Sequence, residues 1–485
     1  MIKLFYNLLK KKKLIFFIFF FLIAILYYSI NSINKYYKKY NSFQNGEIFS
    51  NNNNITKITF QDYEQSVYEK IDYLLAKENF KIKFVEKNEI NILNSNFQQY
   101  EWQIPLLNYY EANQKPTGFL EEWNDKLIIV AGNGQILQIN KSNLINSIEN
   151  ELDLNIQKLH SNIHLIINDE DFYGRSWISV KDILIENDNL YIVYTKKFKS
   201  KETKKIFIEN PEHKKTISIN EDKCYGLSII KANLNEEFIN FQTFIDFDEC
   251  VFSSVPEFTA HLVGGRLINY GEYLLLSTGD FRTRFLTQDQ NSVLGKMILI
   301  DKDNKDVEIF SSGHRNPQGL FFDEENNLIL STEHGPWGGD EINIILKGKN
   351  YGWPISSYGK HYCERQIPMT NKCKEKYLQY PLHNSHSEYG FQEPIKYFEK
   401  SLGISEIIKL SPKFSNSDFT YLVSTLGGDE GRQFYIFNLK DKFNTEILSE
   451  QFISSIERVR DIKLSNDNLY IYLIKEDTSK LSVIF

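Results

Sequence analysis

A polar turn followed by a leucine and an apolar run recurs along the chain, and this repeat constrains the fold more than any other feature. The segments ENDNLYIVYT, around Leu190, and EENNLILSTE, around Leu328, show the pattern. Polar turns between apolar runs are typical of β-hairpins. Six such turns lead into Leu127, Leu190, Leu274, Leu328, Leu422 and Leu469, at spacings of 63, 84, 54, 94 and 47 residues. Repeated strand units joined by loops of variable length predict an all-β fold, a β-propeller. The alternative is a β-sandwich, or two β domains, with the same turn chemistry.

The N-terminus predicts a membrane anchor. Residues 14–30 (LIFFIFFFLIAILYYSI) carry no charge and follow four lysines at residues 10–13. As a helix this segment would extend about 25 Å, which is sufficient for a bilayer core. The next residues, NSINKYYKKY, contain no A-x-A-like cleavage site. Their sequence favours an uncleaved anchor over the alternative, a cleaved signal peptide.

The lysines before the apolar segment place the rest of the chain outside the cytoplasm, according to the positive-inside rule. We therefore expect a cytoplasmic basic segment at residues 1–13 and a single transmembrane helix in the inner membrane at residues 14–30. A polar stalk at residues 31–60 would connect this helix to a periplasmic propeller at residues 61–485.

Charge and cysteine usage narrow the possible partners. The formal net charge is −7, and no basic block occurs beyond the N-terminus, which argues against a nucleic-acid partner. The four cysteines lack C-x-x-C spacing, so a zinc site is not expected. In an exported domain they can form disulfides, and we expect the local pairs Cys224–Cys250 and Cys363–Cys373. Other pairings, or four buried free thiols, are the alternatives.

One stretch stands out for its chemistry. It begins with GHRNPQGL at residue 313 and continues through TEHGPWGGDEINIILKGKNYGWP to residue 354. Arg315 can donate two parallel hydrogen bonds to a carboxylate, and the amide of Asn316 both donates and accepts. Gly335 and Pro336 follow directly on a predicted strand end, where their carbonyl oxygens would be suitable Ca²⁺ ligands.

The motifs GHRNPQGL, EHGPxGGDE and NYGWP resemble those of the glucose/sorbosone dehydrogenase family, the soluble-type PQQ-dependent aldose dehydrogenases. HLVGGRL at residues 261–267, QDQNSVLGKMILID at 288–301 and ERVRDI at 457–462 extend the resemblance. It runs from about residue 115 to the C-terminus. The resemblance implies a six-bladed propeller with PQQ held by arginines and Ca²⁺. It also implies oxidation of the C1 hydroxyl of an aldose to a lactone.

The resemblance assigns roles to individual residues. The positions implied for PQQ binding are Arg315, Asn316, His334, Asp340, Arg458 and Arg460, and the carbonyls of Gly335 and Pro336 are the implied Ca²⁺ ligands. His261 is the candidate general base, because an imidazole with an ordinary pKa of about 6.5 can accept the proton of the C1 hydroxyl. PQQ carries three carboxylates, so the arginines should converge in one cavity although they are far apart in sequence.

The chain departs from the family pattern at four places. His261 is one residue further from Arg266 than the family spacing. Tyr397 and Phe398 stand where members often carry a tryptophan under the substrate. Gly427 stands near the position of a PQQ-contacting lysine, for which Arg432 is the candidate replacement. Trp337 replaces an arginine after EHGP. These departures affect the expectation of glucose oxidation more than that of PQQ binding.

Three functions compete at this point. The first is a PQQ- and Ca²⁺-dependent sugar dehydrogenase that passes electrons to a membrane quinone or a cytochrome. The second is a non-catalytic propeller of the same family that binds a protein or glycan, since a fold alone does not define function. The third is a Ca²⁺ propeller hydrolase such as a lactonase. A lactonase would need carboxylate and amide side chains around a central ion, and no such set is apparent, whereas the repeated arginines favour the dehydrogenase.

Overall fold

The computed structural model describes residues 79–104 and 117–485, with gaps at residues 168, 170–171, 173–176, 199–204, 209–223, 253–259, 366–367, 372, 376–380, 430, 443–444 and 456. The predicted basic segment, anchor and stalk of residues 1–60 lie outside the described residues. Within the described part, none of the helices combines the length and apolar character that crossing a bilayer requires.

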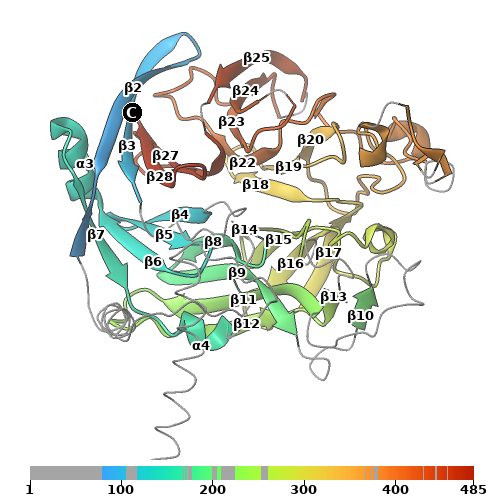
Figure 1. Cartoon of the computed structure of the whole chain (residues 1–485), viewed down its shortest axis with the longest axis horizontal. Coiled ribbons are helices and arrows are strands. Elements are labelled where there is room, and N and C mark those ends of the chain that lie inside the picture. The colour runs from blue at the N-terminus through green and yellow to red at the C-terminus, as the bar shows by residue number, and fades with distance from the viewer. Residues whose placement is uncertain are drawn as a thin grey trace, which may run out of the picture. The chain divides into compact units, whose positions relative to one another are not determined.

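The described residues form six sheets, which we number as blades 1 to 6 (Figure 1). Blade 1 contains β1 (Asn79–Ile82), β4 (Gly118–Trp123), β5 (Lys126–Ala131), β6 (Ile136–Asn140) and β7 (Leu154–Leu159). Blade 2 contains β8 (Val180–Glu186), β9 (Asn189–Phe198), β10 (Lys205–Ile208), β11 (Cys224–Asn233), β12 (Gln242–Asp246) and β13 (Glu249–Phe252). Blade 3 contains β14 (Gly264–Tyr270), β15 (Tyr273–Thr278), β16 (Lys296–Asp301) and β17 (Val307–Ser312).

The remaining blades follow the same plan. Blade 4 contains β18 (Pro317–Asp323), β19 (Leu328–Glu333), β20 (Asp340–Ile344) and β21 (Lys396–Phe398). Blade 5 contains β22 (Ile404–Lys409), β23 (Thr420–Thr425), β24 (Gln433–Leu439) and β25 (Ile447–Ser454). Blade 6 contains β2 (Phe84–Ile92), β3 (Ser95–Gln103), β26 (Val459–Leu464), β27 (Ile471–Lys475) and β28 (Lys480–Ile484). The connections carry α3 (Lys141–Asn150), α4 (Ile163–Ile167), η5 (Arg284–Gln288), η6 (Tyr362–Arg365) and η7 (Ser387–Tyr389).

The inner strands of the six blades form a closed ring. Each inner strand contacts the next one around the ring: β4 contacts β8, β8 contacts β14, β14 contacts β18, β18 contacts β22, and β22 contacts β26. The ring is complete because β26 also contacts β4. A closed ring of radial sheets is a six-bladed β-propeller, so the predicted fold is confirmed and the sandwich is excluded. The ring closes within blade 6, where β3 pairs with β28; Figure 1 shows the blue strands β2 and β3 beside the red strands β27 and β28.

The repeated leucines mark the second strand of each blade. Five of the six lie on β5, β9, β15, β19 and β23, and all five are buried. Leu469 is the exception, because it lies in the turn before β27 and is 45% exposed. Its backbone N–H donates to Ser465 Oγ at 3.1 Å, which holds this residue in the turn rather than on the strand.

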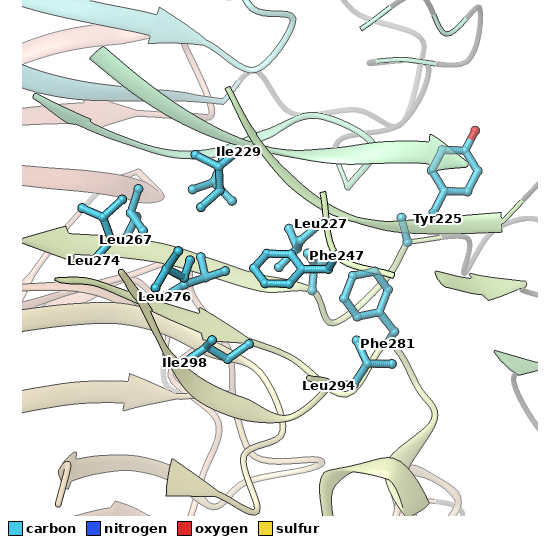
Figure 2. Close-up of a cluster of buried hydrophobic side chains, with 14 of the residues drawn as sticks. Tyr225, Leu227, Ile229, Phe247, Leu267, Leu274, Leu276, Phe281, Leu294 and Ile298 are labelled. Atoms are coloured by element: carbon cyan, nitrogen blue, oxygen red, sulfur yellow. The ribbon is translucent and has the colours of Figure 1, made fainter. Parts of the chain in front are cut away.

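The hydrophobic core is divided among the interfaces between blades. Each of six large buried clusters joins two neighbouring blades, including blades 6 and 1. Figure 2 shows the cluster between blades 2 and 3, whose aliphatic members on strands include Leu227, Ile229, Leu267, Leu274, Leu276 and Ile298. Since burying one such side chain contributes about 1.5–3 kcal/mol, each interface is a substantial part of the stability.

Both expected disulfides are present and confirm the local pairing. Cys224 and Cys250 join β11 to β13 with a Cα–Cα distance of 5.4 Å. Cys363 and Cys373 join the two ends of a loop that begins in η6, with a Cα–Cα distance of 5.7 Å.

Arg266 of β14 lies at the axis, where it meets three buried carboxylates. Its Nη1 is 3.1 Å from Asp182 Oδ1, 2.8 Å from Glu406 Oε2 and 2.8 Å from Asp461 Oδ1. These acids come from β8, β22 and β26. Burial raises the pKa of Asp182 well above its usual range and that of Glu406 to about 7, because one guanidinium cannot fully compensate three buried carboxylates.

The same guanidinium also contacts the remaining inner strands. Arg266 Nε donates to the carbonyl of Gln318 on β18 at 2.6 Å, and the guanidinium carbon lies 5.0 Å from the ring centre of Phe119 on β4. One side chain therefore contacts all five other blades.

Each of the three acids extends this network to the backbone of an adjacent inner strand. The backbone donors are Leu267 N–H to Asp182 at 2.8 Å, Leu320 N–H to Glu406 at 3.2 Å and Leu120 N–H to Asp461 at 2.8 Å. The network thus joins neighbouring blades where each inner strand begins.

Replacing Arg266 with methionine should lower the free energy of unfolding by about 3–5 kcal/mol, because it leaves buried carboxylates without their cation. Urea denaturation at neutral pH measures this change. Arg432→Met is the control, since Arg432 pairs with Asp477 at 2.8 Å on a partly exposed surface and should cost less than about 1 kcal/mol. Equal losses in the two variants would contradict the role of Arg266 at the axis.

Candidate functional site

A cavity of about 240 Å³ lies where the inner strands begin. Its lining includes Phe119 of β4, Val180 of β8, Gly264 of β14, Gln318 of β18 and Arg460 of β26. A water molecule takes up about 30 Å³, so the cavity is large enough for part of an organic ligand rather than a single ion.

β-Bulges direct polar side chains into this cavity. The register of β8 shifts between Val180 and Asp182, that of β18 between Pro317 and Gly319, and that of β26 between Val459 and Asp461. The residues at these shifts are Lys181, Gln318 and Arg460, and all three line the cavity. A bulge interrupts the alternation of side chains along a strand and changes the direction of one of them. Consecutive residues can therefore point one to the axis and the other to the cavity.

Six residues predicted for the site line this one cavity: His261, Arg315, Asn316, His334, Arg458 and Arg460. The arginines therefore converge as expected, although Arg315 lies in the loop between β17 and β18 and Arg460 lies on β26 of blade 6. Gly335, Pro336 and Asp340 are not among the lining residues.

Glu333, at the end of β19, organises the GHRN loop. Its Oε1 accepts the backbone N–H groups of Arg315 and Asn316, the latter at 3.3 Å. Its Oε2 lies 3.0 Å from Nδ1 of His314, whose Nε2 lies 2.8 Å from Ser311 Oγ. Because all of these groups are buried, the loop is held in one conformation.

Arg315 extends from this loop to the neighbouring EHGP segment. Its Nη1 donates to the carbonyls of His334 at 2.8 Å and Gly335 at 2.6 Å. Its Nη2 lies 3.4 Å from Tyr362 Oη. Its Nε is buried and has no hydrogen-bond partner within the part of the chain that the structure describes. An acceptor supplied by a ligand would satisfy this N–H group.

His334 and Asn316 form the adjoining wall. Nε2 of His334 lies 2.6 Å from the carbonyl of Ile404, so this nitrogen carries the proton and donates it. Nδ1 then accepts from the Asn316 amide at 3.4 Å. Burial lowers the pKa of His334, which agrees with a neutral ring.

Arg458 and Arg460 share one carboxylate, that of Glu476. Arg458 Nε lies 3.0 Å from Glu476 Oε2, and Arg460 Nε lies 2.7 Å from Oε1. Burial alone would raise the pKa of Glu476, but the charges of Arg460 and Arg458 lower it to about 2. Arg460 also donates to Gln318 Oε1 at 2.9 Å. The two arginines are thus fixed in place, and their two positive charges exceed the single negative charge of Glu476.

His261 faces the cavity from the loop before β14. Its ring lies 5.0 Å from the Trp177 ring in an edge-to-face arrangement. The flanking residues Ala260 and Leu262 have positive φ values of 57° and 59°. The backbone is therefore tightly folded here, and this folding accommodates the extra residue before Arg266. Burial, followed by the charges of Arg315 and other cations, lowers the pKa of His261 to about 3. The imidazole is therefore neutral at neutral pH.

Asp340 supports a loop instead of facing the cavity. Its Oδ1 accepts the N–H of Gly335 at 3.0 Å, and its Oδ2 accepts those of Leu402 at 2.9 Å and Gly403 at 2.7 Å. Three backbone donors explain why an acid is needed here without any ligand.

The carbonyls of Gly335 and Pro336 remain predicted Ca²⁺ ligands, and the structure shows hydrogen bonds at Gly335 and at the nearby Asp340. Ca²⁺ requires about six to eight oxygen ligands. The Gly335 carbonyl accepts a guanidinium hydrogen bond, and the Asp340 oxygens are bonded to amides. Among the described residues, no group of three His, Cys, Asp or Glu side chains is arranged to hold a metal.

Two of the proposed replacements for family residues also lie elsewhere. Tyr397 stacks on Tyr358 with ring centres 3.9 Å apart, and Phe398 is part of the core between blades 4 and 5. Arg432 pairs with Asp477 at 2.8 Å. The lining contains none of these residues, and the aromatic side chains that line the cavity include Tyr362 and Trp177.

The sequence prediction missed Lys181, Gln318, Tyr362 and Glu476. Lys181 and Gln318 reach the cavity through bulges, and Tyr362 lies on the insertion after NYGWP. Glu476 lies close to the two arginines because β26 and β27 pair, with Val459 opposite Lys475. The sequence did contain a signal for Glu476, because this charged residue directly follows the strand that pairs with ERVRDI in a hairpin.

Residues 178–483 match the family model for glucose/sorbosone dehydrogenase. The aldose sugar dehydrogenase YliI of Escherichia coli is 28% identical over 282 residues, which cover 54% of this chain and 69% of that protein. Quinoprotein glucose dehydrogenase B of Acinetobacter calcoaceticus is 42% identical over 78 residues, 14% of this chain and 16% of that protein.

Solved structures agree with the fold. The soluble aldose sugar dehydrogenase from Escherichia coli, in its apo form, aligns with a TM-score of 0.53 at 19% identity, over 77% of this chain and 96% of that one. A glucose dehydrogenase aligns with a TM-score of 0.56 at 18% identity, over the same shares of the two chains. At these identities the likeness shows the fold alone.

Replacing Glu476 with glutamine should lower the free energy of unfolding at neutral pH by about 2 kcal/mol, because two guanidinium groups lose their shared carboxylate. The folded pKa of about 2 lies below the ordinary value of 4.5. The contribution of Glu476 is therefore present above pH 4.5 and is lost as the pH falls toward 2. Urea denaturation across this range should show a flatter pH dependence in the variant.

The control is Glu236→Gln, at an exposed position on a surface turn. It should keep both the stability and the pH dependence of the wild type. If Glu476→Gln matched this control, Glu476 would not be stabilising the arginine pair.

Proposed function

The chain belongs to the glucose/sorbosone dehydrogenase family, and from this we propose that it oxidises the C1 hydroxyl of an aldose or related sugar to the lactone, with PQQ as the electron acceptor. The observation that carries the proposal is the cationic cavity. Arg315, Arg458 and Arg460 converge there, and Glu476 is the one carboxylate that pairs with any of them among the described residues.

The residues present fit a polyanion of the PQQ type. A tricarboxylate in a partly dry site needs several fixed guanidinium groups to offset its desolvation. Arg458 and Arg460 would hold one end, and Arg315 with Asn316 the other. The buried Arg315 Nε, which has no acceptor among the described residues, would gain one.

His261 would accept the proton of the sugar hydroxyl. A neutral imidazole is the form that can do so, and the lowered pKa of His261 keeps it neutral. PQQ, when bound, supplies the quinone that takes up the hydride from C1. Since nearby cations contribute to the low pKa, an anionic cofactor would offset their effect. His261 would then become a stronger base when the cofactor is in place.

Tyr362 would hold the sugar at the entrance. It is 56% exposed, lines the cavity and directly precedes Cys363, which is held by the disulfide to Cys373. An aromatic face at this position suits a sugar ring, and its Oη lies 3.4 Å from Arg315 Nη2.

The lysine-rich N-terminus and the two disulfides support a location outside the cytoplasm, since disulfides persist in oxidising compartments. A periplasmic domain anchored in the inner membrane would deliver electrons to a membrane quinone or a cytochrome. The carbonyls of Gly335 and Pro336 would hold Ca²⁺, and we derive no step through this ion.

Reconstitution tests the proposal. Purified protein titrated with PQQ should develop the absorbance of bound quinone and then reduce a dye with at least one aldose from a panel. His261→Gln should keep PQQ bound and lower turnover by about 10²- to 10⁴-fold, because it removes the general base. Arg458→Ala should weaken PQQ binding instead. A wild-type protein that fails to bind PQQ would contradict the proposal.

Tyr362→Ala should raise KM for the sugar about fivefold with kcat little changed, because it removes about 1 kcal/mol of stacking that the ground and transition states share. Tyr362→Phe keeps the ring and loses only the hydroxyl, so its KM should stay close to that of the wild type. Initial rates over a range of sugar concentrations separate the two constants. Equal KM values in all three proteins would exclude a stacking role.

A further inference from the structure

Trp177 differs from the other tryptophans of the chain in its hydrogen bonding. Its indole Nε1 is buried and has no hydrogen-bond partner among the residues that the structure describes. The chain contains five tryptophans, and each of the other four donates from Nε1 to a protein oxygen. These bonds run from Trp102 to the carbonyl of Leu152 at 2.9 Å, from Trp123 to Asp188 at 2.8 Å, from Trp337 to Asp429 at 3.1 Å and from Trp353 to Asp280 at 2.8 Å. A buried indole N–H usually has an acceptor, so a ligand is the expected partner of Trp177.

The backbone holds Trp177 at the wall of the cavity. Trp177 precedes β8 and is one of the lining residues. Thr195 Oγ1, on β9, donates to the carbonyl of Trp177 at 3.3 Å and accepts the N–H of Ser179 at 2.8 Å. The indole also packs against the hydrophobic cluster between blades 2 and 3, to which Ile178 belongs. The donor is therefore part of a built cavity wall.

A second buried donor lies in the same cavity, the Nε of Arg315, which likewise has no partner among the described residues. Buried polar groups that lack a partner are rare in folded proteins, and here two of them belong to the lining of one cavity. A ligand rich in oxygen would satisfy both. The proposed function already assigns Arg315 to the cofactor, which leaves the acceptor of Trp177 to be identified.

The position of Trp177 favours the sugar over the cofactor. Its ring lies 5.0 Å from that of His261, the proposed base, so the indole is beside the reacting end of the sugar. A neutral N–H group suits a hydroxyl. The carboxylates of the cofactor instead need the positive charge that the arginines supply.

The chemistry of hydride loss favours the C2 hydroxyl as the acceptor. When hydride leaves C1, the C1 oxygen and the ring oxygen both donate electron density to this carbon. A hydrogen bond to either oxygen would withdraw that density and oppose the reaction. The C2 hydroxyl takes no part in the change, so it can accept the indole N–H equally well in the ground state and in the transition state.

We propose that Trp177 is a specificity-determining residue, whose indole N–H donates a hydrogen bond to the C2 hydroxyl of the sugar. The inference rests on the proposed function, which supplies the sugar and the place of its C1 carbon. The site then favours aldoses with a C2 hydroxyl over their 2-deoxy forms, because a 2-deoxy sugar leaves the buried N–H without an acceptor.

Steady-state kinetics with paired sugars test the proposal on the full-length protein loaded with PQQ. The pairs are glucose with 2-deoxyglucose and galactose with 2-deoxygalactose. In the wild type, loss of the C2 hydroxyl should lower kcat/KM at least about tenfold, mainly through KM. Trp177→Phe keeps an aromatic ring beside His261 but has no N–H. It should lower kcat/KM about tenfold for glucose and galactose, and leave the values for the 2-deoxy sugars within about twofold of the wild type.

Trp123→Phe is the matched control, because Trp123 donates to Asp188 and is not among the lining residues of the cavity. It should keep the wild-type ratio within each pair. The inference is wrong if the wild type oxidises both members of each pair equally well, or if Trp177→Phe keeps the wild-type ratio. An equal loss in Trp177→Phe for both members would indicate the C1 or ring oxygen as the acceptor and overturn the assignment to C2.

NMR signals of the tryptophan indole N–H groups observe the donor directly. Full-length protein whose bound PQQ has been reduced can bind a sugar without oxidising it. Glucose or galactose should move the Trp177 signal downfield and leave the Trp123 signal in place, whereas the 2-deoxy sugars should move neither. Trp177→Phe identifies the signal; if this variant does not fold, Phe substitutions at the other four tryptophans identify it by elimination. A shift with PQQ but none with sugar would assign the donor to the cofactor and overturn the inference.

The two measurements also separate this inference from the proposed function. If the loaded protein oxidises aldoses without regard to the C2 hydroxyl, the proposed function stands and the inference fails. If the protein binds no PQQ, the proposed function fails, and the spectra of the protein alone decide about Trp177. A shift with glucose or galactose that the 2-deoxy sugars do not cause supports recognition of the C2 hydroxyl, and its absence overturns it.

Discussion

The propeller depends on one buried guanidinium. Arg266 compensates three carboxylates from three blades and contacts the inner strands of the other two. Leaving any of these charges unpaired in the interior would cost several kcal/mol. The inner strands must therefore meet at a fixed height around the axis. Their bulges lie at this height, because a regular strand cannot present one side chain to the axis and the next to the cavity.

The axis and the cavity are adjacent but have opposite charge balance. At the axis three acids surround one arginine, so burial raises the pKa of acids such as Glu406. In the cavity two arginines share Glu476, and a third bonds to carbonyl oxygens. The excess of acid is thus confined to the structural network, and the excess of cation faces the space open to a ligand. This separation is what suits the cavity to an anion.

Sequence patterns predicted the parts of the structure that follow from local chemistry. The turn-leucine repeat located the second strand of five blades, and the motifs named six residues that line one cavity. The failures have physical causes. Asp340 looks like a ligand beside EHGP, but three backbone amides take up its oxygens. In the sequence, Lys181 looks like an ordinary residue on one face of an alternating strand. Its side chain faces the cavity because of a register shift in β8, and no residue type in the sequence predicts this shift.

The cations of the cavity connect ligand binding to proton transfer. The charges of Arg315, Arg282 and Lys181 all lower the pKa of His261, after the larger effect of burial. A ligand anion near these groups offsets their repulsion of a proton, so the basicity of His261 should depend on whether the anion is bound. In the proposed reaction, His261 would be a neutral but weak base before the anion binds. With the anion present the same imidazole would be a stronger proton acceptor, so the proposed role of His261 would depend on occupancy of the site without any movement of the fold.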